Sequence, residues 1–231
     1  MRNVFEEYYH NTYENVKIDP REYDLEFNLE HKITLELIGN PKNKMIVDLG
    51  CNTGILLEHM RKKFPDNRFM GLDISKSALS LAKKKGFICY YCDVTKKIPL
   101  KDESVDIMIS TCVIAHIFET DKLLQEVYRV LKKDGYFILT TPNFNSIRDM
   151  IKYMFLGFTP TQIDHEHIRL FNPKLLTEHL IRNRLKPVAW NCYAPIIPLK
   201  LSRMLKINRY IKTNLAKTFL SHKIAVKTIK Q

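Results

Sequence analysis

The stretch of sequence most suited to binding a small ligand runs from Met45 to Gly54, where an apolar strand meets a tight turn and the start of a helix. The glycines at Gly50 and Gly54 let the backbone approach a ligand closely, and the N-terminus of a helix offers free N–H groups. The dinucleotide fingerprint needs another glycine where this chain has Asn52, and the phosphate loop needs a Lys directly after its last glycine. Neither motif is complete. An acid, Asp48, followed by such a turn suits a nucleoside that carries no phosphates.

Two further acids follow the next two apolar segments of the chain. Asp73 closes the second segment, from which a carboxylate can accept hydrogen bonds from ribose hydroxyls. Asp93 follows the third segment and is placed to accept from the exocyclic amine of adenine. Each acid has a local alternative, a helix cap for Asp73 and a turn for Asp93. Their order and spacing after the glycine turn favour the binding interpretation, because ligands of open α/β sheets bind at the carboxyl ends of the strands.

Short apolar segments alternate with helical patterns along the chain, which indicates an α/β sheet that positions these acids. The first five strands are almost purely apolar, as expected of parallel strands covered on both faces. The predicted strands are Met45–Leu49, Phe69–Leu72, Phe87–Tyr91, Val105–Ser110, Tyr136–Thr141, Pro187–Tyr193 and Lys223–Ile229. The predicted helices are Tyr23–Ile38, Gly54–Lys63, Lys76–Lys85 after the N-cap Ser75, and Asp121–Leu131 after Thr120.

These motifs resemble those of the class I S-adenosylmethionine-dependent methyltransferases. The resemblance covers residues 44–142 strongly and extends more loosely over His165–Pro173, which is similar to a segment of small-molecule and lipid-quinone-type members. It implies a doubly wound, Rossmann-like sheet of seven mostly parallel strands with an antiparallel last strand and helices on both faces. The segments that carry it are Asp48–Gly54, Gly71–Ser75, Cys92–Val94, Val105–Ser110 and Leu131–Tyr136.

The resemblance implies S-adenosyl-L-methionine as the cofactor, with the ribose on Asp73 and the adenine on Asp93. Two positions depart from the family pattern. Asn52 replaces the usual middle glycine, a tolerated change because Asn also adopts positive φ, and Ala115 stands where many relatives carry Glu before His116. The cofactor contacts that the resemblance implies are Asp48, Gly50, Cys51, Asn52, Gly54, Asp73, Ile74, Asp93, Val94 and Thr111.

Methyl transfer of this kind needs an oriented acceptor and, for a hydroxyl acceptor, a base. The candidate catalytic residues are His116, after the fourth strand, and His167, which alternates with His165 in the connection after the fifth. Asp164 and Glu166 beside these histidines raise a metal site as an alternative, but no further ligand cluster accompanies them. Cys89 and Cys92 have no second pair of cysteines to complete a zinc site, and in a strand their side chains would point to opposite faces. No metal is expected.

We expect one domain over residues 1–231, with a helical cap at 1–43 and a cofactor-binding core at 44–142. The region 143–186 is interpreted as a substrate lid, and its Met- and Phe-rich run at 150–158 either covers the acceptor or packs on the core. Residues 187–231 are expected to form a C-terminal hairpin with a basic amphipathic insertion.

Charge is segregated along the chain. Residues 1–178 carry 25 Lys and Arg and 25 Asp and Glu, whereas residues 179–231 carry 12 basic residues and no acid. Such segregation indicates an anionic partner or a solubilising face. Apolar residues recur at helical spacing over 197–219 with basic residues between them, a pattern that suits an anionic membrane, docking on the sheet, or a phosphate backbone. Nucleic acid is the weaker alternative.

The function expected from the sequence is O-methylation of a small-molecule or lipid-linked acceptor. The alternatives are an RNA methyltransferase and a cofactor-binding subunit without activity, since a fold does not guarantee catalysis. The absence of a secretory pattern, of a long apolar segment and of a disulfide framework favours a cytoplasmic location, with a peripheral membrane contact left open.

Overall fold

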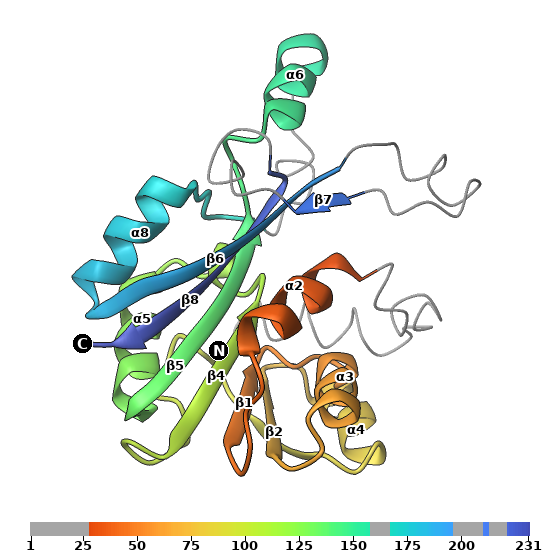
Figure 1. Cartoon of the computed structure of the whole chain (residues 1–231), viewed down its shortest axis with the longest axis vertical. Coiled ribbons are helices and arrows are strands. Elements are labelled where there is room, and N and C mark those ends of the chain that lie inside the picture. The colour runs from red at the N-terminus through yellow and green to blue at the C-terminus, as the bar shows by residue number, and fades with distance from the viewer. Residues whose placement is uncertain (1–27, 158–166, 196–209, 213–220) are drawn as a thin grey trace, which may run out of the picture.

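A computed structural model describes residues 28–157, 167–195, 210–212 and 221–231. Their strands form one sheet in the order β3-β2-β1-β4-β5-β8-β6-β7 (Figure 1). The pairs from β3 to β5 are parallel, and β8 runs antiparallel to both β5 and β6. The strands are β1 (Met45–Leu49), β2 (Arg68–Asp73), β3 (Ile88–Tyr91), β4 (Val105–Thr111), β5 (Leu131–Pro142), β6 (Leu185–Pro195), β7 (Tyr210–Lys212) and β8 (Lys223–Lys230).

All seven predicted strands are present, and the antiparallel placement of the last strand is confirmed. The structure adds β7, which pairs with Tyr193–Pro195 at the edge of the sheet. The interpretation of 197–219 as one continuous helix is therefore wrong at residues 210–212, which form a strand. The edge of β6 offers unpaired backbone groups that a short extended segment can satisfy, and helical spacing does not reveal such a partner. The rest of 197–219 lies outside the described residues.

The helices agree with the sequence to within a few residues. Ser75 caps α4, where its hydroxyl accepts from the Ala78 N–H at 3.3 Å. Thr120, predicted as the residue before a helix, is instead the first residue of α5. The predicted helix at Tyr23–Ile38 is present from Leu29 onward, and residues 23–27 lie outside the described part. The helices are α2 (Leu29–Ile38), α3 (Ile55–Lys63), α4 (Lys76–Lys84), η2 (Ile114–His116), α5 (Thr120–Val130), α6 (Ile147–Leu156) and α8 (Pro173–Arg182).

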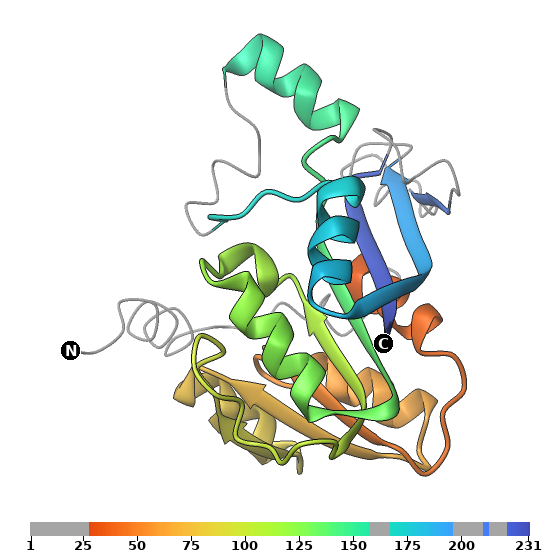
Figure 2. The ribbon, with the colours of Figure 1, turned by 90° about the vertical axis from the view of Figure 1, so that its left-hand side faces the viewer.

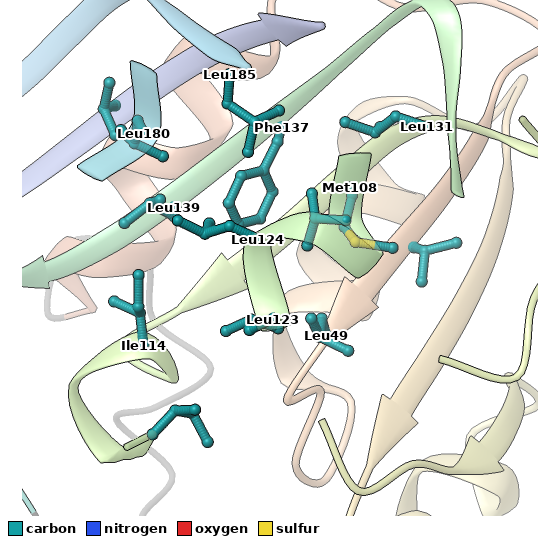
Figure 3. Packing of buried hydrophobic residues seen from close by; sticks show 14 of the residues in the cluster. Leu49, Met108, Ile114, Leu123, Leu124, Leu131, Phe137, Leu139, Leu180 and Leu185 are labelled. Carbon is teal, nitrogen blue, oxygen red and sulfur yellow. The ribbon is translucent and has the colours of Figure 1, made fainter. Parts of the chain in front are cut away.

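Helices cover both faces of the sheet, as predicted. Neighbouring strand residues point to opposite faces, so Met108 packs in one hydrophobic cluster while Ile107 and Ile109 pack in the other. The first cluster joins the sheet to α5 and α8 through residues such as Leu124 and Leu180 (Figure 3). The second joins it to α2, α3 and α4. The central parallel strands β1 and β4 are thus buried on both sides, whereas the edge strand β3 exposes Ile88 and Tyr90.

Within the described ranges, every helix is too short or too polar to cross a bilayer. The connection after β5 leads into α6, which stands apart from the sheet in both views of the chain (Figures 1 and 2). The run at 150–158 does not pack on the core where it is described, so the core-packed alternative is wrong, whereas the interpretation as an acceptor lid stays a prediction. Met154 and Phe155 are 77% and 78% exposed, and α6 contributes no residue to the ligand cavity described below.

Candidate active site

A cavity of about 530 Å³ opens at the carboxyl edge of the sheet, where β1, β2 and β4 end. Its wall contains all but one of the residues predicted at the cofactor, although they come from four separate segments of the chain. Gly54 is the exception. The predicted residues that line the cavity are Asp48, Gly50, Cys51, Asn52, Asp73, Ile74, Asp93, Val94 and Thr111.

The turn after β1 has the backbone conformation that its sequence predicts. Gly50, Asn52 and Gly54 have φ angles of 82°, 49° and 78°, so the ability of Asn52 to replace a glycine is confirmed. The N–H groups of Gly50 and Cys51 donate to the carbonyl of Leu72 at 2.7 and 3.0 Å, which ties the turn to the end of β2. The turn is thus fixed before any ligand arrives.

The two glycines serve different needs. A Cβ on Gly50 would lie 2.3 Å from Val113 Cγ2, so the glycine is required by packing as well as by any ligand beside it. A Cβ on Gly54 would meet Ala82 at 3.1 Å and Phe87 at 3.4 Å. Gly54 therefore lets α3 begin close to α4, and the structure places it behind the cavity wall.

Asp73 is both a structural anchor and part of the cavity wall. Its Oδ2 accepts from the Asn52 N–H at 2.8 Å, and its Oδ1 accepts from the Ser75 N–H at 2.8 Å. The cap of α4 is supplied by Ser75, so the helix-cap interpretation of Asp73 is wrong. Burial raises the pKa of Asp73, and the backbone N–H bonds oppose that rise. The carboxylate as a whole retains acceptor capacity for a ligand hydroxyl.

Asp93 makes the local turn that the sequence raised as an alternative and also lines the cavity. Its Oδ1 accepts from the N–H and the hydroxyl of Thr95 at 3.0 and 2.6 Å. Lys96 Nζ lies 3.4 Å from its Oδ2. The two interpretations of Asp93 are therefore compatible, because the turn holds the carboxylate at the cavity wall.

Asp48 is the most unusual acid of the site. The residue is 1% exposed, and its Oδ1 accepts no hydrogen bond from the described residues. Burial, together with the nearby charges of Asp73 and Cys89, raises the pKa of Asp48 to about 8. A buried acid without a partner favours its neutral form until a cation arrives. Asp48 thus gives the cavity a latent site for a positively charged ligand group.

The two candidate catalytic histidines come together from distant parts of the chain. The rings of His116 and His167 stack with centroids 4.7 Å apart and planes inclined by 30°. The N–H groups of Ile168 and Arg169 both donate to the Ala115 carbonyl at 2.9 Å, which holds the second segment against the first. His116 lines the cavity, whereas His167 contacts the ring of His116 and is not part of the cavity wall. His165, Asp164 and Glu166 lie outside the described residues.

Sequence reasoning missed the contribution of the N-terminal helix to the site. Asn28, Glu30 and His31, around the start of α2, line the cavity. Glu30 forms an ion pair with Lys223 of β8, and the Cys112 thiol donates to Glu30 Oε1 at 3.3 Å. No local pattern signals these contacts, because the partners are far apart in the chain. The other wall residues that were not predicted are Thr53, Ile55, Leu56, Cys92, Thr95, Cys112, Val113, Ile117, Phe118 and Glu119.

Cys89 and Cys92 belong to opposite hydrophobic clusters, as the strand alternation predicted. In the part of the chain that the structure describes, no three His, Cys, Asp or Glu side chains gather as a metal ion would need.

The arrangement defines a doubly wound α/β protein whose ligand cavity is lined by acids at the carboxyl edge of its sheet. A family model described as a methyltransferase domain matches residues 40–184. The chain therefore belongs to the class I S-adenosylmethionine-dependent methyltransferase family.

Solved structures show the same fold. A geranyl diphosphate C-methyltransferase from Streptomyces coelicolor, in complex with Mg²⁺, geranyl diphosphate and S-adenosyl-L-homocysteine, aligns over 100% of both chains with a TM-score of 0.68 and 12% identity. An S-adenosylmethionine-dependent methyltransferase from Archaeoglobus fulgidus aligns over 89% of this chain and 94% of its own with a TM-score of 0.65 and 18% identity.

Curated relatives match about half of the chain. A malonyl-[acyl-carrier protein] O-methyltransferase from Hamiltonella defensa is 28% identical over 117 residues, which are 50% of this chain and 45% of the relative. A ubiquinone/menaquinone biosynthesis C-methyltransferase from Desulfotalea psychrophila is 28% identical over 124 residues, 51% of this chain and 50% of its own. The chain thus spans about half the length of these relatives.

Proposed function

We propose that this protein transfers the methyl group of S-adenosylmethionine to an oxygen atom of a small-molecule or lipid-linked acceptor. The observation that carries the proposal is the set of three acids, Asp48, Asp73 and Asp93, in one cavity at the carboxyl ends of three neighbouring parallel strands. The similarity to an O-methyltransferase that acts on malonyl-[acyl-carrier protein] supports an oxygen acceptor.

The residues of the cavity fit the cofactor of this family. The unpartnered oxygen of Asp48 complements the positively charged amino group of its methionine part. Asp73 would hold the ribose hydroxyls through its remaining acceptor capacity, and Asp93 would accept from the adenine amine. The glycine turn at Gly50 would lie along the methionine part. When bound, the cofactor supplies an activated methyl carbon.

The protein's own residues would then orient the acceptor and hold its proton. His116, on the cavity wall, is placed to accept the proton of an acceptor hydroxyl. His167 stacks on it and would fix the plane of its ring. Val113, Ile117 and Phe118 form an apolar stretch of the same wall and would exclude water from the reacting atoms.

The region 143–186 enters this proposal as a support for the acceptor side. Arg169 Nη2 donates to the Phe118 carbonyl at 2.6 Å, so the segment that carries His167 is fastened to the wall next to His116. We infer a cytoplasmic protein that makes a peripheral contact with membranes through its basic C-terminal segment.

The proposal is tested by incubating the protein with methyl-labelled cofactor and separate pools of small metabolites, lipids and RNA. We expect label in the small-molecule or lipid pool, in a form that base hydrolysis releases from an ester or that mass spectrometry places on oxygen. Label in RNA would replace the proposal with the RNA alternative. Cofactor binding by calorimetry without label in any pool would indicate a subunit that lacks activity.

A further inference from the structure

The helix α6 carries an apolar face that the described residues leave open. Its large side chains recur at the three- and four-residue spacing that places them on one side of a helix. Met154 and Phe155 are 77% and 78% exposed, far more than a core helix would leave. The exposed apolar residues of this face, which we call the α6 face, are Ile147, Met150, Ile151, Met154 and Phe155.

The topology places the α6 face at the edge of the sheet that contains the ligand cavity. β5 and β6 both run antiparallel to β8, so they are parallel to each other, and Pro142 and Tyr193 both pair with Lys223. α6 follows the carboxyl end of β5, and the segment 196–209 follows the carboxyl end of β6. Both therefore leave the sheet from the same edge, and both views show α6 projecting beyond it (Figures 1 and 2).

The positive charge near this edge of the sheet indicates which kind of partner can bind there. Four basic residues and no acid fall in the segment 196–209, both ends of which adjoin strand residues at this edge. Other basic residues of the C-terminal part lie elsewhere, since Lys186 and Lys230 are at the opposite end of β6 and β8. A second copy of the chain would bring the same positive charge against this end, which opposes self-association. Nucleic acid matches the charge but has no apolar surface to cover Met154 and Phe155. An anionic bilayer satisfies both features, because an apolar helix face enters the acyl boundary while basic residues meet the headgroups.

We propose that the α6 face inserts into anionic lipid surfaces and turns the cavity edge of the sheet toward the membrane. The inference rests on the proposed function only for its biological purpose, which is access to a lipid-linked acceptor. Insertion of α6 itself depends on the exposed side chains and the charge distribution, and it can be measured without methyl transfer.

The experiment is flotation of the full chain with vesicles of phosphatidylcholine and phosphatidylglycerol, compared with vesicles of phosphatidylcholine alone. We expect the parent protein to float with the anionic vesicles. The double variant Met154→Asp, Phe155→Asp should lose roughly tenfold or more of its vesicle partitioning, whereas Met154→Leu, Phe155→Leu should retain it. A matched control, Leu175→Asp with Ile181→Asp, changes two half-exposed apolar residues on α8 and should bind like the parent.

Several outcomes would overturn the proposal. A parent protein that ignores anionic vesicles has no inserting element, and an Asp variant that floats like the parent assigns binding to another surface. Light scattering without lipid that shows a dimer for the parent and a monomer for the Asp variant would make the α6 face a self-interface. Cofactor affinity by calorimetry is read separately for each variant, so a failure of the proposed function is distinguishable from a failure of membrane insertion.

Discussion

The charge of Asp48 lowers the stability of the cofactor-free protein, although the proposed binding of the cofactor's amino group needs the same charge. Its carboxyl group is buried, one oxygen has no partner among the described residues, and its pKa lies near 8. In the unfolded chain the same group has a pKa of about 3.9. At pH values between these two pKa values, Asp48 holds a proton in the folded state and has lost it in the unfolded state. The cofactor-free protein therefore loses stability as the pH rises from about 4 to about 8.

We therefore predict that Asp48→Asn stabilises the cofactor-free protein at pH 8 and leaves its stability at pH 4 nearly unchanged. The variant removes an ionisable group whose charged form is costly to bury. Urea unfolding at both pH values measures the effect. The same variant should weaken cofactor affinity, because an amide cannot provide the negative charge that the ligand's amino group needs. A variant that is less stable than the parent at pH 8 would contradict the assignment of the raised pKa.

Asp73 gives a second prediction at the residue scale. Replacing a charged acceptor of ribose hydroxyls costs of order 1.5–3 kcal/mol, so Asp73→Ala should weaken cofactor affinity by roughly tenfold or more in calorimetry. Asp73 also accepts from the Asn52 and Ser75 N–H groups on its two different oxygens. Asp73→Asn keeps the shape and an acceptor for one of these N–H groups, whereas Asp73→Ala removes both, so the Asn variant is the better matched of the two. If Asp73→Asn melts like the parent and binds with the parent's affinity, the ribose role is wrong.

The residues that sequence reasoning located are those in contiguous motifs. Asp48, Gly50 and Asp73 occupy strand ends whose hydrophobic runs are readable in the sequence, and the cavity wall confirms their proximity. Glu30 was missed because its role depends on Lys223, a partner almost two hundred positions away. Side-chain packing between distant segments leaves no periodic trace in either of them.

At the scale of elements, the ends of a strand could be predicted where its residues are buried. β1 begins and ends where predicted, since apolar residues occupy all of its positions except that of Asp48. β5 starts at Leu131 instead of Tyr136, because the polar stretch before Tyr136 joins the ladder at a bulge that pairs Val105 with Leu131. α6 was predicted as a helix-like apolar run, but its exposure depends on the partner that covers it, which hydropathy alone does not specify.

Arg129 on α5 supplies a prediction about how elements are held together. Its guanidinium donates to both Glu126 oxygens at 2.8 and 2.6 Å and to the carbonyls of Ile98 and Leu100, each at 2.9 Å. It thereby fastens the segment after β3 to α5. Arg129→Ala should lower the free energy of unfolding by about 2 kcal/mol or more, because buried carbonyls and a charged partner lose their donor.

The measurement is urea unfolding, with Lys122→Ala as the control. Lys122 pairs with Glu119, the N-cap residue of α5, but the Lys122 side chain is 62% exposed, so its loss should change stability little. Equal effects of the two substitutions would show that the Arg129 network contributes no more than a surface ion pair.

At the scale of the whole molecule, the topology of the sheet brings the cavity, α6 and both ends of the basic segment 196–209 to one edge. The carboxyl ends of β1, β2 and β4 build the cavity, and those of β5 and β6 lead to α6 and to the basic segment. The proposed contact with membranes and the proposed lipid-linked acceptor require the cavity, the exposed apolar face of α6 and the positive charge to lie on the same side of the protein. The charge segregation and the cavity residues could be predicted from the sequence alone. The exposed apolar face of α6 could be recognised only once the structure had placed this helix away from the sheet.

The last prediction concerns that charge. Reversing Lys200, Arg203, Lys206 and Arg209 to Glu should abolish sedimentation with anionic vesicles, because each basic residue near such a surface contributes about 1 kcal/mol. Binding of the parent protein should weaken as salt is raised, since ions screen the attraction. Cofactor affinity should be unchanged, because the described cavity wall contains none of the four residues. If the parent sediments equally at low and high salt, electrostatic attraction is not what holds it, and the apolar face of α6 would have to act alone. If the reversed variant instead loses retention on RNA while vesicle binding persists, the basic segment follows a phosphate backbone and the membrane contact belongs to α6 without it.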